Sequence, residues 1–220
     1  MNDLFRWDWV ADRGDEIWMK TAEHLWLTVV AVGIGFAISF PLALFAYRHR
    51  RFLGPITALS GILYTIPSLA LFAALVPFTG LSFLTAEIGL VSYTLLILIR
   101  NIVTGLEGVS PDAREAAIGM GYTDMQLLWK VEIPLAIPAI AAGLRIATVT
   151  TIGLVTVTSL IGLGGLGYYI LLGLQRTFST AVILGGALSL VLAILADVLL
   201  LRSERLLAPW ARRRKREVTA

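Results

Sequence analysis

Long apolar runs without a charged residue constrain the fold of this chain more than any other feature. Stretches free of Asp, Glu, Lys, Arg and His occupy residues 25–47, 52–86, 88–99, 146–175 and 177–196. An α-helix needs roughly 20 apolar residues to cross the hydrocarbon core of a bilayer. With neighbouring residues added to the shorter runs, the pattern predicts five transmembrane helices, near residues 24–47, 55–78, 83–104, 135–161 and 180–202. The expected fold class is therefore an all-α integral membrane protein.

The composition excludes several classes of protein. Hydrophobic residues make up 57% of the chain and charged residues 15%, against roughly 45–50% and about 25% in soluble domains. A soluble domain of 220 residues could not bury that much apolar surface, which argues against a soluble enzyme, a disordered protein or a free nucleic-acid binder. The absence of cysteine excludes a disulfide framework and a thiolate metal site. The two histidines, His24 and His49, lie at opposite ends of one predicted helix, so no metal site is expected.

The basic residues predict how the chain is oriented in the membrane. Lys and Arg concentrate in segments 48–51, 100–130 and 202–216. Cytoplasmic segments of membrane proteins are enriched in Lys and Arg. We therefore expect a multi-pass protein of the cell (plasma or inner) membrane with its N-terminus outside and its C-terminus in the cytoplasm, an arrangement that five crossings also require.

The chain divides into three parts by composition. Residues 1–20 mix tryptophan with acidic residues, which suits a segment at the outer membrane interface and not a cleaved signal peptide, whose start is basic. Residues 21–205 form the predicted transmembrane domain. Residues 206–220 form a basic cytoplasmic tail, which either anchors the topology or binds anionic lipid.

The segment of about 105–134 is predicted to contain two short helices. Ser110–Pro111 is typical of a helix start, and the glycines within Gly119–Gly121 end or bend that helix. Thr123 can cap a second helix over Asp124–Glu132, which closes before the next proline. From these patterns alone, a compact cytoplasmic structure and a plain connection between two spans are both open.

This segment resembles the EAA motif of permease subunits of ABC importers. That motif reads Glu-Ala-Ala, three residues, Gly, nine residues, then Ile-x-Leu-Pro. Here Glu115-Ala116-Ala117 is followed by Gly121 and by Val131-x-Ile133-Pro134. The two replacements, Val for Ile and Ile for Leu, are conservative in size and polarity. The resemblance implies a type I ABC importer permease fold in which this segment forms cytoplasmic coupling helices.

The same resemblance implies partners. Two ATP-binding cassette subunits would dock on the coupling helices, bind ATP and Mg²⁺ and hydrolyse the nucleotide, so this chain would be no enzyme and would hold no cofactor of its own. A second permease chain, identical or similar, would complete the pathway, and an extracytoplasmic solute-binding protein would deliver substrate. The residues expected to couple this chain to the ATPase are Glu115, Ala116, Ala117, Gly119, Gly121, Tyr122, Asp124 and Pro134.

Other segments resemble the osmoprotectant branch of this family, which imports glycine betaine, choline, carnitine and related quaternary ammonium compounds. They are residues 24–28, 64–70, 143–148 and 161–167. The branch implies translocation of such a compound by alternating access. The alternatives are a permease for an amino acid such as methionine or another small solute and, more remotely, a membrane scaffold subunit without transport.

Polar residues within the predicted spans are candidates for the translocation pathway. In the second span Pro67 frees a backbone carbonyl, beside Tyr64, Thr65 and Ser68. The fourth span is rich in hydroxyl groups, and its candidates are Thr151, Thr158 and Ser159. A kink that serves packing, and hydroxyls that serve helix contacts, explain the same residues equally well.

A glycine-rich stretch follows the fourth span. Its glycines, expected to form an outer gate or hinge, are Gly162, Gly164, Gly165 and Gly167. Their spacing fits the letters of a dinucleotide-binding fingerprint, but that site needs a soluble βαβ unit. Two charges are expected near the cytoplasmic side of the late spans, Arg145 and Asp197, which either pair or reach the interface separately.

Overall fold

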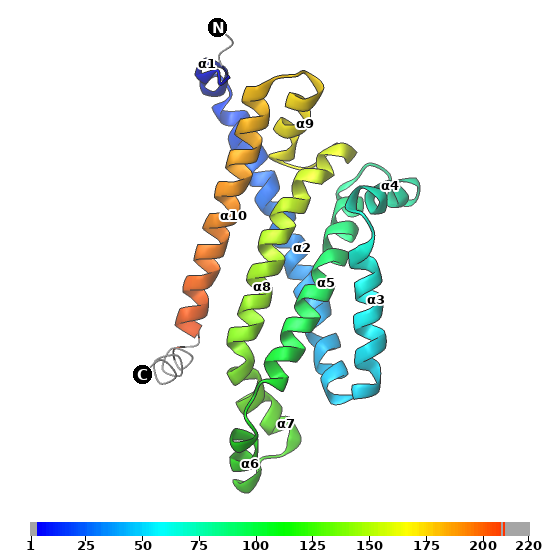
Figure 1. Ribbon diagram of the computed structural model, residues 1–220, viewed down its shortest axis with the longest axis vertical. Coiled ribbons are helices and arrows are strands. Elements are labelled where there is room, and N and C mark those ends of the chain that lie inside the picture. Colours follow the sequence, from blue (N-terminus) through cyan, green and yellow to red (C-terminus); the bar gives the residue numbers. More distant parts are fainter. Residues whose placement is uncertain (1–3, 208, 210–220) are drawn as a thin grey trace.

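The computed structural model describes residues 4–207 and 209, and this part of the chain is helical, with no strand (Figure 1). The basic residues 212–216 of the expected tail lie outside it. Its elements are α1 (Trp7–Ala11), α2 (Gly14–Arg48), the 3₁₀ turn η1 (Arg50–Phe52), α3 (Leu53–Thr65), α4 (Ser68–Thr79), α5 (Phe83–Glu107), α6 (Pro111–Gly119), α7 (Asp124–Leu127), the π-helical turn η2 (Leu128–Glu132), α8 (Ile133–Val155), the 3₁₀ turn η3 (Thr156–Ile161), α9 (Gly167–Gln175) and α10 (Ser179–Leu207).

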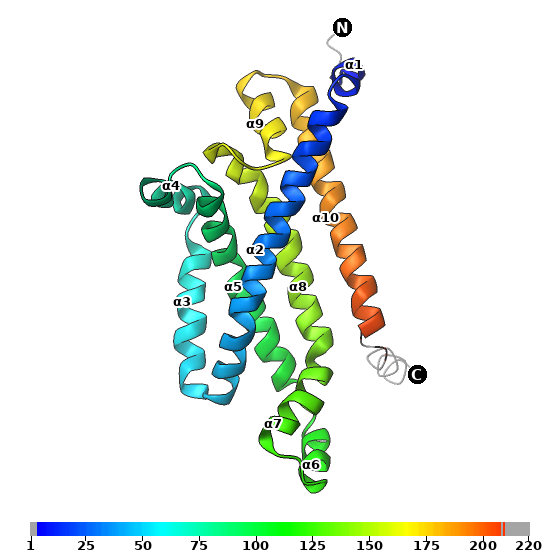
Figure 2. The ribbon, with the colours of Figure 1, turned by 180° about the vertical axis from the view of Figure 1, so that it is seen from behind.

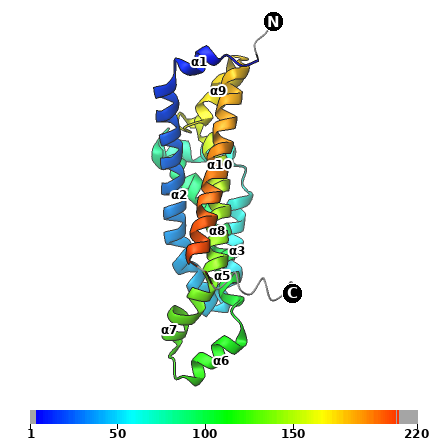
Figure 3. The same ribbon diagram turned by 90° about the vertical axis from the view of Figure 1, so that its left-hand side faces the viewer.

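Four of the five predicted spans are confirmed as long apolar helices. They are α2, α5, α8 and α10, each long and apolar enough to cross a membrane. All four run along the long axis of the molecule, with α2, α5 and α8 in the middle, α3 on one side and α10 on the other (Figures 1 and 2). The N-terminal end and the end of α10 lie toward opposite ends of this bundle (Figure 3).

The second predicted span, near residues 55–78, is wrong as a single straight helix. The chain bends by 94° between α3 and α4. Ile66 is extended, with φ −64° and ψ 128°, because the ring of Pro67 excludes the helical conformation from the preceding residue. Helix α3 has 13 residues and is about 20 Å long, shorter than the roughly 30 Å of a hydrocarbon core. The bundle therefore has five spans only when α3 and α4 are counted as one broken span.

The hydrophobic core is centred on α5, which packs between α2 and α8. Small residues allow these helices to approach closely. A Cβ atom on Gly35 of α2 would lie 1.9 Å from Oγ1 of Thr94, and one on Gly143 of α8 would lie 2.5 Å from Cβ of Asn101. Glycine at helix contacts is typical of transmembrane bundles, where packing rather than the hydrophobic effect holds helices together.

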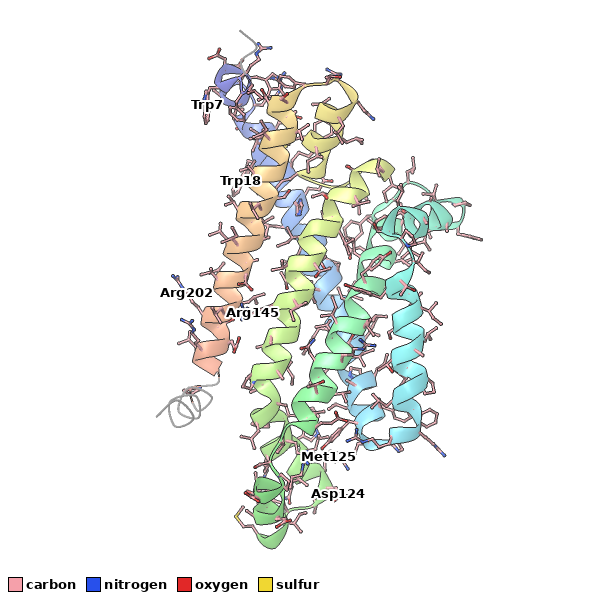
Figure 4. The ribbon with its side chains drawn as sticks, in the orientation of Figure 1. Trp7, Trp18, Asp124, Met125, Arg145 and Arg202 are labelled. Atoms are coloured by element: carbon pink, nitrogen blue, oxygen red, sulfur yellow. The ribbon has the colours of Figure 1, made fainter. Side chains whose placement is uncertain are left out.

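The periphery of the bundle is apolar and exposed, as a surface facing lipid requires. Helix α10 contacts α8 and α9 and leaves apolar side chains such as Ile194 and Leu199 more than half exposed. The exposed tryptophans Trp7 and Trp18 lie at the end of the bundle that carries the N-terminus (Figure 4). Trp is enriched at membrane interfaces, so this end of the bundle is consistent with the interfacial segment expected at residues 1–20.

Candidate functional site

The loop between α5 and α8 forms a knob that projects beyond the long helices, at the end opposite the N-terminus (Figure 3). Both predicted helix starts within it are confirmed. The Ser110 hydroxyl accepts a hydrogen bond from the backbone N–H of Ala113, at 3.3 Å, with Pro111 in the first turn of α6. Thr123 and Gln126 form a reciprocal capping box at the start of α7, with bonds of 3.3 Å and 3.0 Å.

The corner between α6 and α7 depends on one glycine. Gly121 has φ +81°, in the left-handed region that favours glycine. Around it the N–H of Tyr122 donates to the carbonyl of Ala117 at 3.1 Å, and the N–H of Gly121 donates to that of Ile118 at 2.9 Å. This pair of bonds is the Schellman motif, which ends a helix at a left-handed residue. The predicted end of the helix within Gly119–Gly121 is therefore confirmed, and the left-handed residue that ends it is Gly121.

The predicted end of the second short helix is wrong. We expected it to close before Pro134, but α7 continues through the π turn η2 directly into α8. Pro134 lies in the first turn of α8, and its missing N–H removes one i→i−4 bond. The wider π turn just before it carries the helix past this gap without a break, so α7 and the fourth span form one continuous rod.

The knob exposes apolar side chains together with a carboxylate. Ile118, Met120 and Met125 are each at least 60% exposed, and Glu115 is exposed as well. Figure 4 shows Met125 beside Asp124 at this end of the molecule, and the Asp124 side chain is 93% exposed. Exposed apolar patches rimmed by polar groups are typical of protein interaction sites.

Not all of the expected coupling residues lie on this exposed surface. Ala116, Gly119 and Gly121 are exposed, Tyr122 and Pro134 are half-buried, and Ala117 is only 1% exposed. Ala117 packs inside its own chain, so of the two motif alanines only Ala116 is available to a partner.

A buried polar network lies under the knob, and the sequence analysis missed it. Arg114 of α6 donates to Glu132 Oε1 at 2.9 Å, to the Tyr47 hydroxyl at 3.0 Å and to the Leu106 carbonyl at 2.7 Å. Tyr47 donates in turn to Glu132 Oε1 at 2.7 Å. The one available signal was Glu132 itself, an acid between apolar residues directly before the span.

The candidates around the broken span lie at its surface. Tyr64, Thr65 and Pro67 are exposed, and Ser68 is half-buried. The carbonyl of Ile66, left without a helical partner by the break, accepts a hydrogen bond from Tyr93 of α5. The rings of Tyr64 and Tyr93 pack edge to face with centroids 5.9 Å apart. The break therefore exposes the Tyr64 ring, which packs on the buried Tyr93 beside the end of a helix.

The hydroxyl candidates of the fourth span do not lie on the exposed surface of the broken span. Thr151 and Thr158 are buried in the chain, and Ser159 is half-buried. Thr158 and Ser159 donate to the carbonyls of Val155 and Thr156 one turn back, both at 2.8 Å, while the Thr151 hydroxyl has no partner among the described residues. In this chain the Thr158 and Ser159 hydroxyls therefore bond to their own helical segment, and the Thr151 hydroxyl is buried.

The glycine-rich stretch forms a loop at the same end of the bundle as the N-terminus, and Gly164, Gly165 and Gly167 in it are tightly packed. Gly162, Gly164 and Gly165 have φ of +84°, +106° and +47°. A Cβ atom on Gly165 would lie 2.5 Å from Cβ of His24, and one on Gly167 would lie 2.2 Å from the Thr156 carbonyl oxygen. A 3₁₀ turn precedes the stretch, and the described chain contains no strand, so a dinucleotide-binding unit is excluded here.

His24 fastens that loop to the fourth span. Its Nδ1 accepts a hydrogen bond from the Leu166 N–H at 3.3 Å, which leaves the protonated Nε2 to donate to the Ile152 carbonyl at 3.0 Å. No group of three or more His, Cys, Asp or Glu able to hold a metal ion occurs among the described residues.

Arg145 and Asp197 form an ion pair and do not reach the membrane interface separately. Arg145 donates to both carboxylate oxygens of Asp197, at 2.9 Å and 3.0 Å, and contacts Glu204 at 3.5 Å. The two carboxylates link the C-terminal half of α10 to α8, on which Figure 4 labels Arg145. The contribution of Glu204 was not anticipated.

Comparison with known proteins assigns the family. The sequence matches the binding-protein-dependent transport system inner membrane component over residues 31–209. The chain belongs to this family. It is therefore a multi-pass permease subunit of an ABC importer in the inner membrane, and the resemblance drawn from the EAA motif is confirmed.

Relatives of the permease come from several bacteria. It is 38% identical to the glycine betaine/carnitine/choline transport system permease protein OpuCB of Bacillus subtilis over 207 residues, which are 94% of this chain and 95% of that protein. It is also 38% identical to the osmoprotectant import permease protein OsmW of Salmonella typhimurium over 194 residues, which are 86% of this chain and 90% of that protein.

Solved structures share the fold of the permease. An inward-facing form of the MetNI methionine ABC transporter has a TM-score of 0.76 at 23% identity, over 87% of this chain and 95% of that one. An amino acid ABC transporter has a TM-score of 0.72 at 20% identity, over 91% of this chain and 98% of that one. The predicted type I importer permease fold is thus confirmed.

Proposed function

We propose that this permease translocates a quaternary ammonium osmoprotectant, such as glycine betaine, choline or carnitine, by alternating access. The observation that carries the substrate class is the 38% identity, over 94% of the chain, to a glycine betaine/carnitine/choline permease. The transporters of methionine and another amino acid share only the fold, at 20–23% identity, so the amino-acid alternative has less support.

A permanently charged ammonium needs such a protein, because it loses its hydration on entering hydrocarbon at a large cost in free energy. The pathway candidates that fit this cargo are those at the broken span, since aromatic faces attract cations and the exposed ring of Tyr64 lies there, packed against the buried Tyr93. Thr65, Pro67 and Ser68 belong to the same break. The glycines of the 162–167 loop lie at the same end of the bundle as the break, because η3, which precedes the loop, packs on α4. They are proposed to shape the outer mouth as a rigid rim more than a hinge, because Gly164, Gly165 and Gly167 are tightly packed.

The knob is proposed as the docking site of the ATPase. Its exposed Ile118, Met120 and Met125 would enter a cleft of an ATP-binding cassette subunit, with Glu115 and Asp124 as polar contacts. ATP and Mg²⁺ would be bound and used by that subunit. Two such subunits, a second permease chain and an extracytoplasmic binding protein complete the proposed assembly.

Transport assays in liposomes test the substrate. The permease is reconstituted with its ATPase and binding protein, ATP is enclosed, and uptake of radiolabelled glycine betaine, choline, carnitine and methionine is measured. We expect ATP-dependent uptake of at least one quaternary ammonium compound, abolished when the ATPase subunit carries a variant unable to hydrolyse ATP. Uptake of methionine alone would contradict the proposal.

A further inference from the structure

Helix α6 is attached to the rest of the permease almost entirely by one side chain. Ala117 is the only residue that α6 buries, and a single alanine contributes little apolar contact. The guanidinium of Arg114, by contrast, bonds to groups from three other elements: Tyr47 at the end of α2, Leu106 at the end of α5, and Glu132 in η2. Arg114 is therefore the main connection between this helix and the bundle.

Arg114, Tyr47 and Glu132 form a ring of hydrogen bonds, in which each side chain bonds to the other two. The Glu132 side chain is 7% exposed, and its Oε1 accepts from both Arg114 and Tyr47. A buried carboxylate is costly unless it is paired and hydrogen-bonded. The planar guanidinium presents several donors in a fixed geometry, so a displacement of α6 cannot leave the three acceptors behind without breaking these bonds.

Two further arginine contacts fasten the same end of the bundle, a hydrogen bond to a backbone carbonyl and an ion pair. Arg48, the last residue of α2, donates to the Asp124 carbonyl at 2.7 Å, and Arg50 pairs with Glu107 at the end of α5. The polar contacts that tie α10 to the bundle are separate, since they run from Asp197 and Glu204 to Arg145 of α8.

We propose that Arg114 is a positioning residue that transmits displacement of α6 into α2, α5 and the continuous α7–α8 rod together. This inference rests on the proposed function of the knob as the ATPase docking site. Helix α6 is joined to α5 by the short segment 108–110. Without the network, displacement of α6 by a docked ATPase would be absorbed by that segment, while α7 would still reach α8, with which it is continuous, and α2 through Arg48.

The test replaces the network without leaving a charge buried. In the double variant Arg114→Met/Glu132→Met, apolar side chains of similar length replace the ion pair, a change that proteins often tolerate without loss of stability. Tyr47→Phe removes a single hydroxyl. Arg51→Gln is the control, because Arg51 is an exposed arginine of the neighbouring η1 turn whose guanidinium lies over the Phe52 ring, 4.7 Å from its centroid, and takes no part in the network.

The full complex is assayed in liposomes for ATP hydrolysis and for uptake, and substrate imported per ATP hydrolysed is compared. We expect the double variant to keep hydrolysing ATP while import per ATP falls at least about 5-fold, the lower end of typical allosteric coupling. Tyr47→Phe removes the bond donated to Glu132 and the bond accepted from Arg114 but leaves the ion pair, so it should lower the ratio less, about 2-fold or more. Arg51→Gln should match the unaltered complex.

A double variant with the unaltered ratio would overturn the proposal, because the network would then serve stability alone. If the double variant does not assemble, Tyr47→Phe decides, and an unchanged ratio in that variant also overturns it. If instead the proposed substrate class is wrong, the unaltered complex itself will show no uptake of quaternary ammonium compounds, so the two failures can be told apart. The network is then scored on stimulation of ATP hydrolysis by the binding protein incubated with methionine, which the double variant should lose while it keeps the basal rate of hydrolysis.

Discussion

Gly121 holds the corner between α6 and α7 at φ +81°, with no atom within 4 Å of a Cβ built on it. Space is therefore available for a side chain, and only the backbone conformation requires glycine. Gly119, two residues earlier, also has open space around it but a helical backbone. This pair separates the cost of a left-handed backbone from every other effect of adding a methyl group.

We expect Gly121→Ala to lower the stability of the permease by about 1–2 kcal/mol, the cost of a left-handed residue with a Cβ. Gly121→Asn should lose less, because asparagine visits this conformation more readily. Gly119→Ala should raise stability by about 0.5–1 kcal/mol, as alanine does within a helix. Denaturation of the purified protein, followed by tryptophan fluorescence, measures these effects, and equal losses for both alanine variants would contradict the argument.

Whole helices in this bundle are placed by residues that lack side chains. Helices α2 and α5 approach at Gly35, where a Cβ would meet the Thr94 hydroxyl at 1.9 Å, while Gly33 on the same helix has nothing within 4 Å. We expect Gly35→Ala to destabilise the permease by about 1–3 kcal/mol through overpacking, and Gly33→Ala to have no such effect.

The second change Thr94→Ala should restore much of the stability that Gly35→Ala loses, because it removes the atom that the new methyl group meets. Thermal unfolding of the single and double variants measures this. If the double variant were no more stable than Gly35→Ala, close approach at this point would not be what places α2 on α5.

Helix α10 depends on its polar link to α8, because most of its apolar surface faces outward. We expect Asp197→Asn to cost about 1.5 kcal/mol, the lower range for hydrogen bonds to a charged group, since the Asp197 side chain is partly exposed. Arg202→Gln, at an exposed position on the same helix, is the control. Limited proteolysis and thermal unfolding should separate the two variants, and equal stability would contradict the link.

The whole molecule has two chemically distinct ends, which predict its orientation. The knob and the arginines Arg48, Arg50 and Arg114 lie at one end, while Trp7 and Trp18 lie at the other (Figures 3 and 4). By the enrichment of basic residues in cytoplasmic segments, the knob is expected in the cytoplasm and the N-terminus outside.

The absence of natural cysteine allows a direct test of that orientation. Asp112 of α6 and Gln175 at the end of α9 are both exposed. In spheroplasts, a membrane-impermeant maleimide should label Gln175→Cys at once and Asp112→Cys only after permeabilisation, while the unaltered protein stays unlabelled. The reverse pattern would place the knob outside and exclude its proposed docking to a cytoplasmic ATPase.

Features that depend on neighbouring residues could be predicted from the sequence by itself. Apolar runs located α2, α5, α8 and α10, and the Ser110 and Thr123 caps and the left-handed Gly121 followed from local hydrogen bonding and backbone sterics. Pro67 was recognised as an irregularity in the second span, but the 94° bend that it introduces was not predicted. A proline breaks a helix locally, whereas the angle of the bend depends on what α4 packs against.

Contacts between distant residues were decided only by the tertiary structure. Tyr47, Arg114 and Glu132 come from three separate segments, and nothing local marks them as partners. They meet because close packing of α2, α5 and α8 sets the register of each helix against the next, and that register depends on small residues such as Gly35 and Gly143. The burial of Ala117 has the same origin, since the side chains that cover a residue lie elsewhere in the chain.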